Sequence, residues 1–195
     1  MRLQDFDLIL PVKLKLAKYL PPSFRMFFII LFFPISSTIA GIGKSLYLAS
    51  FYYQIPFELL IAVADVESSF DPLVINVNGK KVNCPTNAKC IYYQRGTIIK
   101  SPSKEVAKKM LKFLHMKGYN YDVGLMQINR LWIEKYNLPP EAFLDTSYNA
   151  LFGAFILRRL LNKYGYPEAI WRYNGKRSYL KKVLRKLKSY KRTDR

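Results

Sequence analysis

The sequence predicts an α+β fold that is predominantly helical and carries a small β insertion. Apolar residues recur at helical spacing along most of the chain after residue 44, whereas a stretch between residues 75 and 99 alternates as strands do. Half of the 195 residues are hydrophobic and 15% are aromatic, which is enough to build the core of one ordinary domain.

The N-terminal segment divides the chain at about residue 44. Residues 26–35 form an uninterrupted apolar run that follows Arg25. Thr38 and Ala40 fit the small-residue positions of a signal-peptidase site, with cleavage after Ala40. We expect residues 1–43 to be a basic segment with a signal peptide or an uncleaved inner-membrane anchor, and residues 44–195 to be the domain. Export would place the protein in the periplasm or cell envelope; burial of the apolar run in a soluble core is the alternative.

The charge of the chain is strongly positive. The formal net charge is +19, with 32 Lys+Arg against 13 Asp+Glu. Such an excess favours nucleic acid, anionic lipid headgroups or an acidic cell wall, although a basic proteome or a solubility effect would also produce it. The chain has no recognisable nucleic-acid-binding motif, so we expect no nucleic-acid partner. The basic helix after Lys176 either contacts an anionic membrane or wall, or presents a solvated face.

The first half of the domain alternates between helices and short strands. Leu46, Leu48, Phe51 and Tyr52 predict the apolar face of a first helix, and a second is expected from Pro56 through Glu67, ending near Asp71-Pro72. The Asn78-Gly79 pair inside residues 75–82 predicts a hairpin, with further strands at residues 91–93 and 97–99.

The second half is predicted to be helical. A helix opens at Ser101-Pro102 and ends before Gly118, with Val106, Met110, Leu111 and Leu114 on one face. Further helices are expected over residues 130–136, 148–164, 167–171 and 178–190. The last of them would place Leu180, Val183, Leu184 and Leu187 on one face.

The two cysteines, Cys84 and Cys90, lie close together in a polar stretch. Together with the distant His115 they are too few for a structural zinc site, so we expect neither a metal nor another cofactor. In an exported domain the cysteines would form a disulfide; a pair of free loop thiols is the alternative.

Glu67 is the first candidate for chemistry, because it follows Ala64 and Val63 by three and four residues and so lies on or beside the apolar stripe of its helix. Partial burial would raise its pKa and keep it protonated near neutral pH, as a general acid requires. A salt-bridged or helix-terminal glutamate is the plain alternative. Asp65, two residues away, points elsewhere on a helix.

Two polar segments could complete such a site. In residues 124–129, Gly124 permits close backbone approach, while Gln127 and Asn129 can hold the amide and hydroxyl groups of a sugar. In Tyr173-Asn174-Gly175, the tyrosine offers a flat face and a hydroxyl group. Asp122, just before the first segment, has a structural hydrogen-bonding role as its simplest interpretation.

Taken in order, these segments resemble the soluble-lytic-transglycosylase (SLT) family, over about residues 44–183. Residues 67–70 are similar to its catalytic Glu-Ser segment, residues 124–129 to its Gly-Leu-Met-Gln segment, and Tyr173-Asn174 to its Tyr-Asn segment. Asp145, Asn149 and Gly153 resemble a helix entry of the family. Residues 118–129 are similar to the small specialised members that serve secretion, conjugation and pilus machines. The chain departs from the family pattern in one place: the family usually has a residue, often alanine, between its Tyr-Asn pair and the next glycine, whereas here Gly175 follows Asn174 directly.

The resemblance implies a lysozyme-like fold and a monomeric enzyme that cleaves peptidoglycan glycan strands with Glu67 as its catalytic acid and base. It implies a set of substrate-binding residues: Ser68, Gly124, Met126, Gln127, Asn129, Tyr173 and Asn174. It also implies 1,6-anhydro-muramyl products, local cell-wall remodelling, and a secretion, conjugation or pilus complex as a partner. The alternatives are a hydrolytic goose-type muramidase and a non-catalytic wall-binding scaffold component.

Overall fold

Our computed structural model describes residues 38–85 and 87–193. The apolar run at residues 26–35, predicted to be a signal peptide or anchor, lies outside these residues. The first helix begins at Thr38, so the predicted cleavage position after Ala40 falls in its first turn. None of the helices in the described ranges is both long enough and apolar enough to cross a bilayer.

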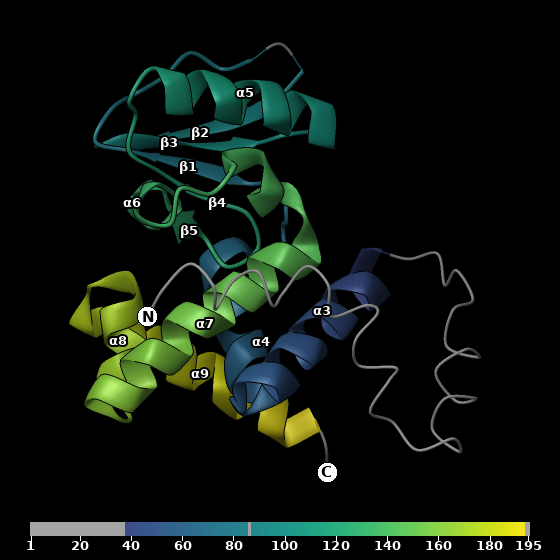
Figure 1. Cartoon of the computed structure of the whole chain (residues 1–195), viewed down its shortest axis with the longest axis vertical. Helices are drawn as coiled ribbons and strands as arrows, with labels where there is room; N and C mark the ends of the chain where they lie inside the picture. The colour runs from purple at the N-terminus through teal and green to yellow at the C-terminus, as the bar shows by residue number, and fades with distance from the viewer. Residues whose placement is uncertain (1–37, 86, 194–195) are drawn as a thin grey trace. The chain divides into compact units, whose positions relative to one another are not determined.

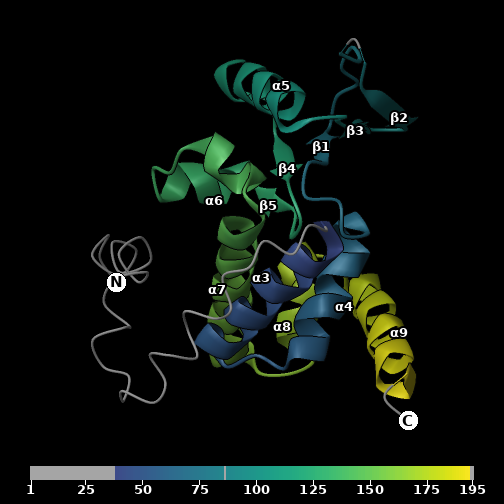
Figure 2. The same ribbon diagram turned by 90° about the vertical axis from the view of Figure 1, so that its right-hand side faces the viewer.

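Five helices form one part of the described structure: α3 (Thr38–Tyr53), α4 (Phe57–Ser68), α7 (Thr146–Tyr164), α8 (Glu168–Asn174) and α9 (Arg177–Thr193). α3 packs along α7, and α9 packs along α4. Figures 1 and 2 show these helices together at one end, with the sheet and α5 at the other. Both α4 and α7 contribute to the apolar core, in which Leu60, Val63 and Leu157 are completely buried.

The sheet holds five strands in the order β2-β3-β1-β4-β5, all pairs antiparallel. Their bounds are β1 Ile75–Asn78, β2 Lys89–Tyr93, β3 Gly96–Lys100, β4 Tyr121–Val123 and β5 Ile128–Asn129. α5 (Lys104–Met116) lies over the sheet (Figure 1), and the short helices α6 (Arg130–Lys135) and η3 (Pro140–Leu144) lead from the sheet to α7. The fold is the predicted one, a predominantly helical lysozyme-like α+β fold.

The predicted hairpin around Asn78-Gly79 is wrong. β1 is a central strand whose two edges are taken by β3 and β4, so the residues that follow Gly79 have no free edge to pair with. The Gly79 N–H instead donates to the Arg95 carbonyl at 2.6 Å, and the chain continues into a loop. The strands predicted at residues 91–93 and 97–99 are confirmed, and they form the β2–β3 hairpin.

The predicted face of the first helix is also wrong, although the helix itself is confirmed. Leu46 is buried, but Leu48, Phe51 and Tyr52 are 50%, 78% and 49% exposed. The buried face consists of Ile42, Leu46 and Ala49, with Ser45 and Ser50 beside them. Ser45, Ala49 and Ser50 are small, and α3 approaches α7 closely enough for the hydroxyl groups of Ser45 and Ser147 to lie 2.9 Å apart.

Two predictions about the C-terminal helices need smaller corrections. α8 continues to Asn174 instead of ending at Trp171, so the Tyr-Asn pair belongs to its last turn. On α9, Val183 is buried as predicted, but Leu184 is 46% exposed, and the unpredicted Tyr179 is buried beside Val183. The sulfur atoms of Cys84 and Cys90 form a disulfide, as expected for an exported domain.

Candidate active site

α4 places Glu67 at the boundary between the two parts of the fold. The helix begins after Pro56 and buries Leu59, Leu60, Val63 and Ala64 along one side, so Glu67 follows in the last turn on the packed side. Ser69 and Phe70, which end the helix, both have positive φ angles (53° and 63°). Non-glycine residues seldom adopt this conformation, and where they do the backbone is often held for function.

The Glu67 carboxyl lies in a weakly solvated environment. Its pKa is raised to about 7, and burial is the largest cause; the nearby Asp122 carboxylate also raises the pKa, whereas the Tyr179 hydroxyl, the Asn174 side chain and the charge of Lys182 lower it. A carboxyl group with a pKa near neutrality can both give and accept a proton at physiological pH. The sequence-based expectation for the Glu67 pKa therefore agrees with its surroundings.

The segment from Gly124 to Gln127 is held against α7 by Asn149. The completely buried Asn149 side chain accepts a hydrogen bond from the Met126 N–H at 2.7 Å and donates to the Val123 and Phe143 carbonyls at 2.9 and 2.8 Å. Gly124 has φ +78°, and a Cβ there would collide with the Asn149 amide nitrogen. Gly153, on α7, leaves room for the Met126 side chain in the same way.

Two hydroxyl groups connect this segment to the helices around Glu67. The buried Ser68 Oγ donates to the Leu125 carbonyl at 2.8 Å, and the Tyr173 hydroxyl donates to the Met126 carbonyl at 2.9 Å. Because Ser68 ends α4 and Tyr173 lies in the last turn of α8, residues far apart in the sequence are held around one carboxyl group. Asn174, next to Tyr173, is exposed, and its side chain lies close enough to Glu67 to lower the pKa of that carboxyl.

The other predicted sugar-binding side chains bond mainly to the protein itself. The Gln127 amide donates to the Gly124 carbonyl at 2.9 Å, and Met126 is completely buried. The Asn129 carbonyl oxygen caps α6 at the Leu131 N–H, and its amide donates to Asp122 at 2.7 Å. These contacts indicate that all three residues shape the site, and their binding of sugars stays a prediction.

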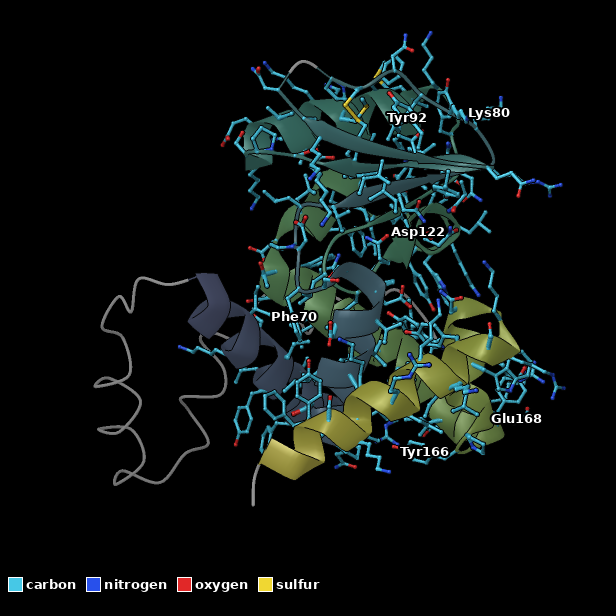
Figure 3. The ribbon with its side chains drawn as sticks, turned by 180° about the vertical axis from the view of Figure 1, so that it is seen from behind. Phe70, Lys80, Tyr92, Asp122, Tyr166 and Glu168 are labelled. Carbon is cyan, nitrogen blue, oxygen red and sulfur yellow. A yellow bond between two sulfur atoms is a disulfide. The ribbon has the colours of Figure 1, made fainter. Side chains whose placement is uncertain are left out.

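Asp122 lies on the side of the sheet that faces α4 and α9 (Figure 3). Its two carboxylate oxygens accept hydrogen bonds from Asn78 and Asn129, each at 2.7 Å, while burial raises its pKa. The carboxylate is thus engaged in a network across three strands, in agreement with the structural role expected for it. Asp65 accepts hydrogen bonds from Tyr190 and Lys186 on α9, both at 2.7 Å.

Tyr179 is a functional candidate that the sequence analysis missed. Its side chain is 4% exposed, and its hydroxyl lies close enough to Glu67 to lower the pKa of that carboxyl. The hydroxyl nevertheless makes no hydrogen bond of standard geometry to any group in the described ranges. No sequence signal marks it, since a tyrosine at a helix-packing position looks like an ordinary core residue.

Replacing Tyr179 by phenylalanine should move the pH dependence of catalysis without unfolding the protein. The hydroxyl stabilises the Glu67 carboxylate, so its loss raises the pKa of Glu67 and shifts the alkaline limb of the kcat/KM profile to higher pH. Tyr190→Phe is the matched control, because that hydroxyl bonds Asp65 on the same pair of helices. If Tyr179→Phe shifted the alkaline limb of the kcat/KM profile to lower pH, the Tyr179 hydroxyl would not be stabilising the Glu67 carboxylate.

The fold and the site together define a class of protein. It is a lysozyme-like protein in which a glutamic acid with a pKa near neutrality lies at the end of a packed helix. Residues 48–194 match the family profile of the transglycosylase SLT domain. The chain therefore belongs to the SLT family of peptidoglycan lytic transglycosylases, which are lyases that act on polysaccharide, and the resemblance seen in the sequence is confirmed. Searches of curated proteins and of solved structures returned no match.

Proposed function

We propose that the protein cleaves the β-1,4 bond between N-acetylmuramic acid and N-acetylglucosamine and releases 1,6-anhydro-muramyl ends, with Glu67 as its catalytic residue. The family defines a lytic transglycosylase acting on peptidoglycan in the cell envelope. The proposal adds the product and the residue. The single observation that supports it most is the placement of Glu67 at the buried end of α4, beside the hydrogen bonds of Ser68 and Tyr173, where burial raises its pKa to about 7.

In the proposed reaction, the Glu67 carboxylic acid gives its proton to the glycosidic oxygen as the bond from that oxygen to C1 of the muramyl residue breaks. The acetamido oxygen of the same sugar attacks C1 and stabilises the cationic centre. The Glu67 carboxylate then takes the proton of the C6 hydroxyl, O6 bonds to C1, and the acetamido group leaves. Glu67 ends the cycle protonated, so one group serves as acid and then as base.

The arrangement of Asp122 favours this route over a hydrolytic muramidase. Asp122 is the carboxylate that acts on the Glu67 pKa, yet both its oxygens already accept hydrogen bonds from asparagine amides. A route in which the substrate acetamido group stabilises the cation needs no second enzyme carboxylate. Tyr173 and Asn174 would then orient Glu67 and the acetamido group.

Mass spectrometry of the ends released from purified peptidoglycan tests the product. The full-length protein should release 1,6-anhydro-muramyl ends, and Glu67→Gln should release none. Reducing muramyl ends would identify a muramidase. No release by a folded, soluble protein would favour a non-catalytic wall-binding component.

We also propose that residues 1–43 direct export, and that the enzyme opens the wall locally for a secretion, conjugation or pilus machine. The support is the sequence of residues 26–40 and the similarity of residues 118–129 to specialised members of the family. Fractionation of cells that express the full chain tests export: the protein should be found with the envelope, and recovery from the cytosol alone would contradict it.

A further inference from the structure

Lys182 is an exposed cation beside the candidate catalytic acid. It lies on α9, and it forms no salt bridge within the described ranges. The neighbouring Lys186, one helical turn later, is paired with Asp65 at 2.7 Å. Both lysines lie on the side of α9 that faces α4. Lys186 has an anionic partner there, and Lys182 has none within the described ranges.

The packing of the two helices places this charge near Glu67. Lys186 and Tyr190 both contact Asp65, and Tyr179 at the other end of α9 lies against Glu67. The two helices therefore run in opposite directions where they pack: the later residues of α9 contact Asp65, and the earlier Tyr179 lies against Glu67, which comes later on α4. Lys182 lies one turn before Lys186 and three residues after Tyr179, so it shares their face at the C-terminal end of α4.

Neither nearby carboxyl group neutralises Lys182. The Asp122 oxygens are held by Asn78 and Asn129. Glu67 must be protonated to act as an acid, and in that state it carries no charge for the lysine to pair with. A lysine ammonium has three donors, and an unpaired one beside the site of cleavage is suited to an anionic group on the substrate.

We propose that Lys182 binds a carboxylate carried by the muramyl side of the substrate. In peptidoglycan each muramyl residue bears a lactyl carboxyl, which is free in peptide-free strands and amide-linked in strands that retain stem peptides, and those peptides carry carboxylates of their own. The shared ligand chemistry is a carboxylate within a few bonds of the cleaved sugar. This inference rests on the proposed function and adds a specificity residue to it.

The test compares full-length protein with three single variants on three substrates. Lys182→Gln removes the charge and Lys182→Arg keeps it, while Lys181→Gln removes a neighbouring exposed lysine and so matches the change in net charge. The substrates are intact peptidoglycan, glycan strands stripped of peptides by an amidase, and intact peptidoglycan whose carboxyl groups are coupled to methylamine. Initial rates give kcat and KM separately.

We expect Lys182→Gln to lower kcat/KM by about five- to ten-fold, mainly through KM, on at least one of the two carboxylate-bearing substrates. Loss on intact peptidoglycan alone identifies a stem-peptide carboxylate, and loss on stripped strands alone identifies the lactyl carboxylate. Lys182→Arg should retain most of the activity. Lys181→Gln should resemble the parent, and on the methylamide substrate Lys182→Gln should equal the parent.

Three results would overturn the proposal: parent-like KM of Lys182→Gln on every substrate, an equal loss on the methylamide substrate, or an equal loss for Lys181→Gln. If Lys182 acted only through the effect of its charge on the Glu67 pKa, Lys182→Gln would shift the alkaline limb of the kcat/KM profile to the same extent on all three substrates. If the parent releases no 1,6-anhydro ends, the proposed function fails; if it releases them and Lys182 has no effect on KM, the specificity proposal alone fails.

Discussion

Glu67→Gln should lower kcat/KM on peptidoglycan by about a thousand-fold or more, because the amide can neither give the proton to the leaving oxygen nor take it from the C6 hydroxyl. Glutamine keeps the shape of the side chain, so the fold should be unchanged. Glu58→Gln, in the first turn of the same helix, is the matched control and should retain the activity of the parent. Substantial turnover by Glu67→Gln would contradict the assignment of Glu67 as acid and base.

The same group should make both activity and stability depend on pH. The acid form of Glu67 is depleted above its pKa of about 7, so kcat/KM of the parent should fall on the alkaline side of neutrality. In the unfolded chain this carboxyl returns to its ordinary pKa of 4.5. Between pH 4.5 and 7 the native state binds more protons at Glu67 than the unfolded state does. The free energy of unfolding therefore falls as the pH rises through this range.

Glu67→Gln should therefore stabilise the protein in alkaline solution. The variant does not titrate at this position, so the difference in unfolding free energy should grow from pH 4.5 to 7 and then level off at up to about 3 kcal/mol in favour of glutamine. Urea unfolding of the parent and the variant at pH 5 and pH 8 measures this difference. A gap that is equal at the two pH values would show that Glu67 ionises freely in the native state.

Local patterns were sufficient to predict the parts of the site that lie on single elements. Glu67 could be placed on the packed side of its helix from its spacing to Val63 and Ala64, and the helix predicted over residues 148–164 is α7, which begins at Thr146. Those features depend on residues within one or two turns of each other. The sequence therefore carries the information in a form that periodicity and capping rules can recover.

Features that depend on distant packing could not be predicted. The exposed side of α3 carries the large apolar residues Leu48 and Phe51, whereas the small Ala49 is buried, so a preference for large side chains selected the wrong residues. The Asn78-Gly79 pair indicated a local turn, but β1 finds its partners 18 or more residues later. Tyr179 and Lys182 approach Glu67 because α9 packs on α4, which is a tertiary contact without a local signal.

Replacing Asn149 should have the largest effect on stability among the residues around the site. In Asn149→Ala the Met126 N–H and the Val123 and Phe143 carbonyls lose their side-chain partner inside the core. Buried polar groups left without partners cost about 1–3 kcal/mol each, so we expect a loss of roughly 3–6 kcal/mol in unfolding free energy. Asn120→Ala, which removes an exposed bond to Asn129, should cost less than about 1 kcal/mol.

A double-mutant cycle with Gly124→Ala separates the role of Asn149 in packing from its role in hydrogen bonding. Gly124→Ala alone is destabilising for three reasons: its φ of +78° is unfavourable for alanine, and the new Cβ would strike both the Asn149 amide and the Phe143 carbonyl. In the Asn149→Ala background the collision with the amide is relieved, while the backbone strain and the close approach to the Phe143 carbonyl are left. Urea unfolding should then give the double variant a smaller loss than the sum of the single losses, by about 1 kcal/mol or more. Additive losses would mean that Gly124 is required for its backbone conformation and its distance from the Phe143 carbonyl, and that Asn149 holds the Met126 segment without fixing how closely it approaches α7.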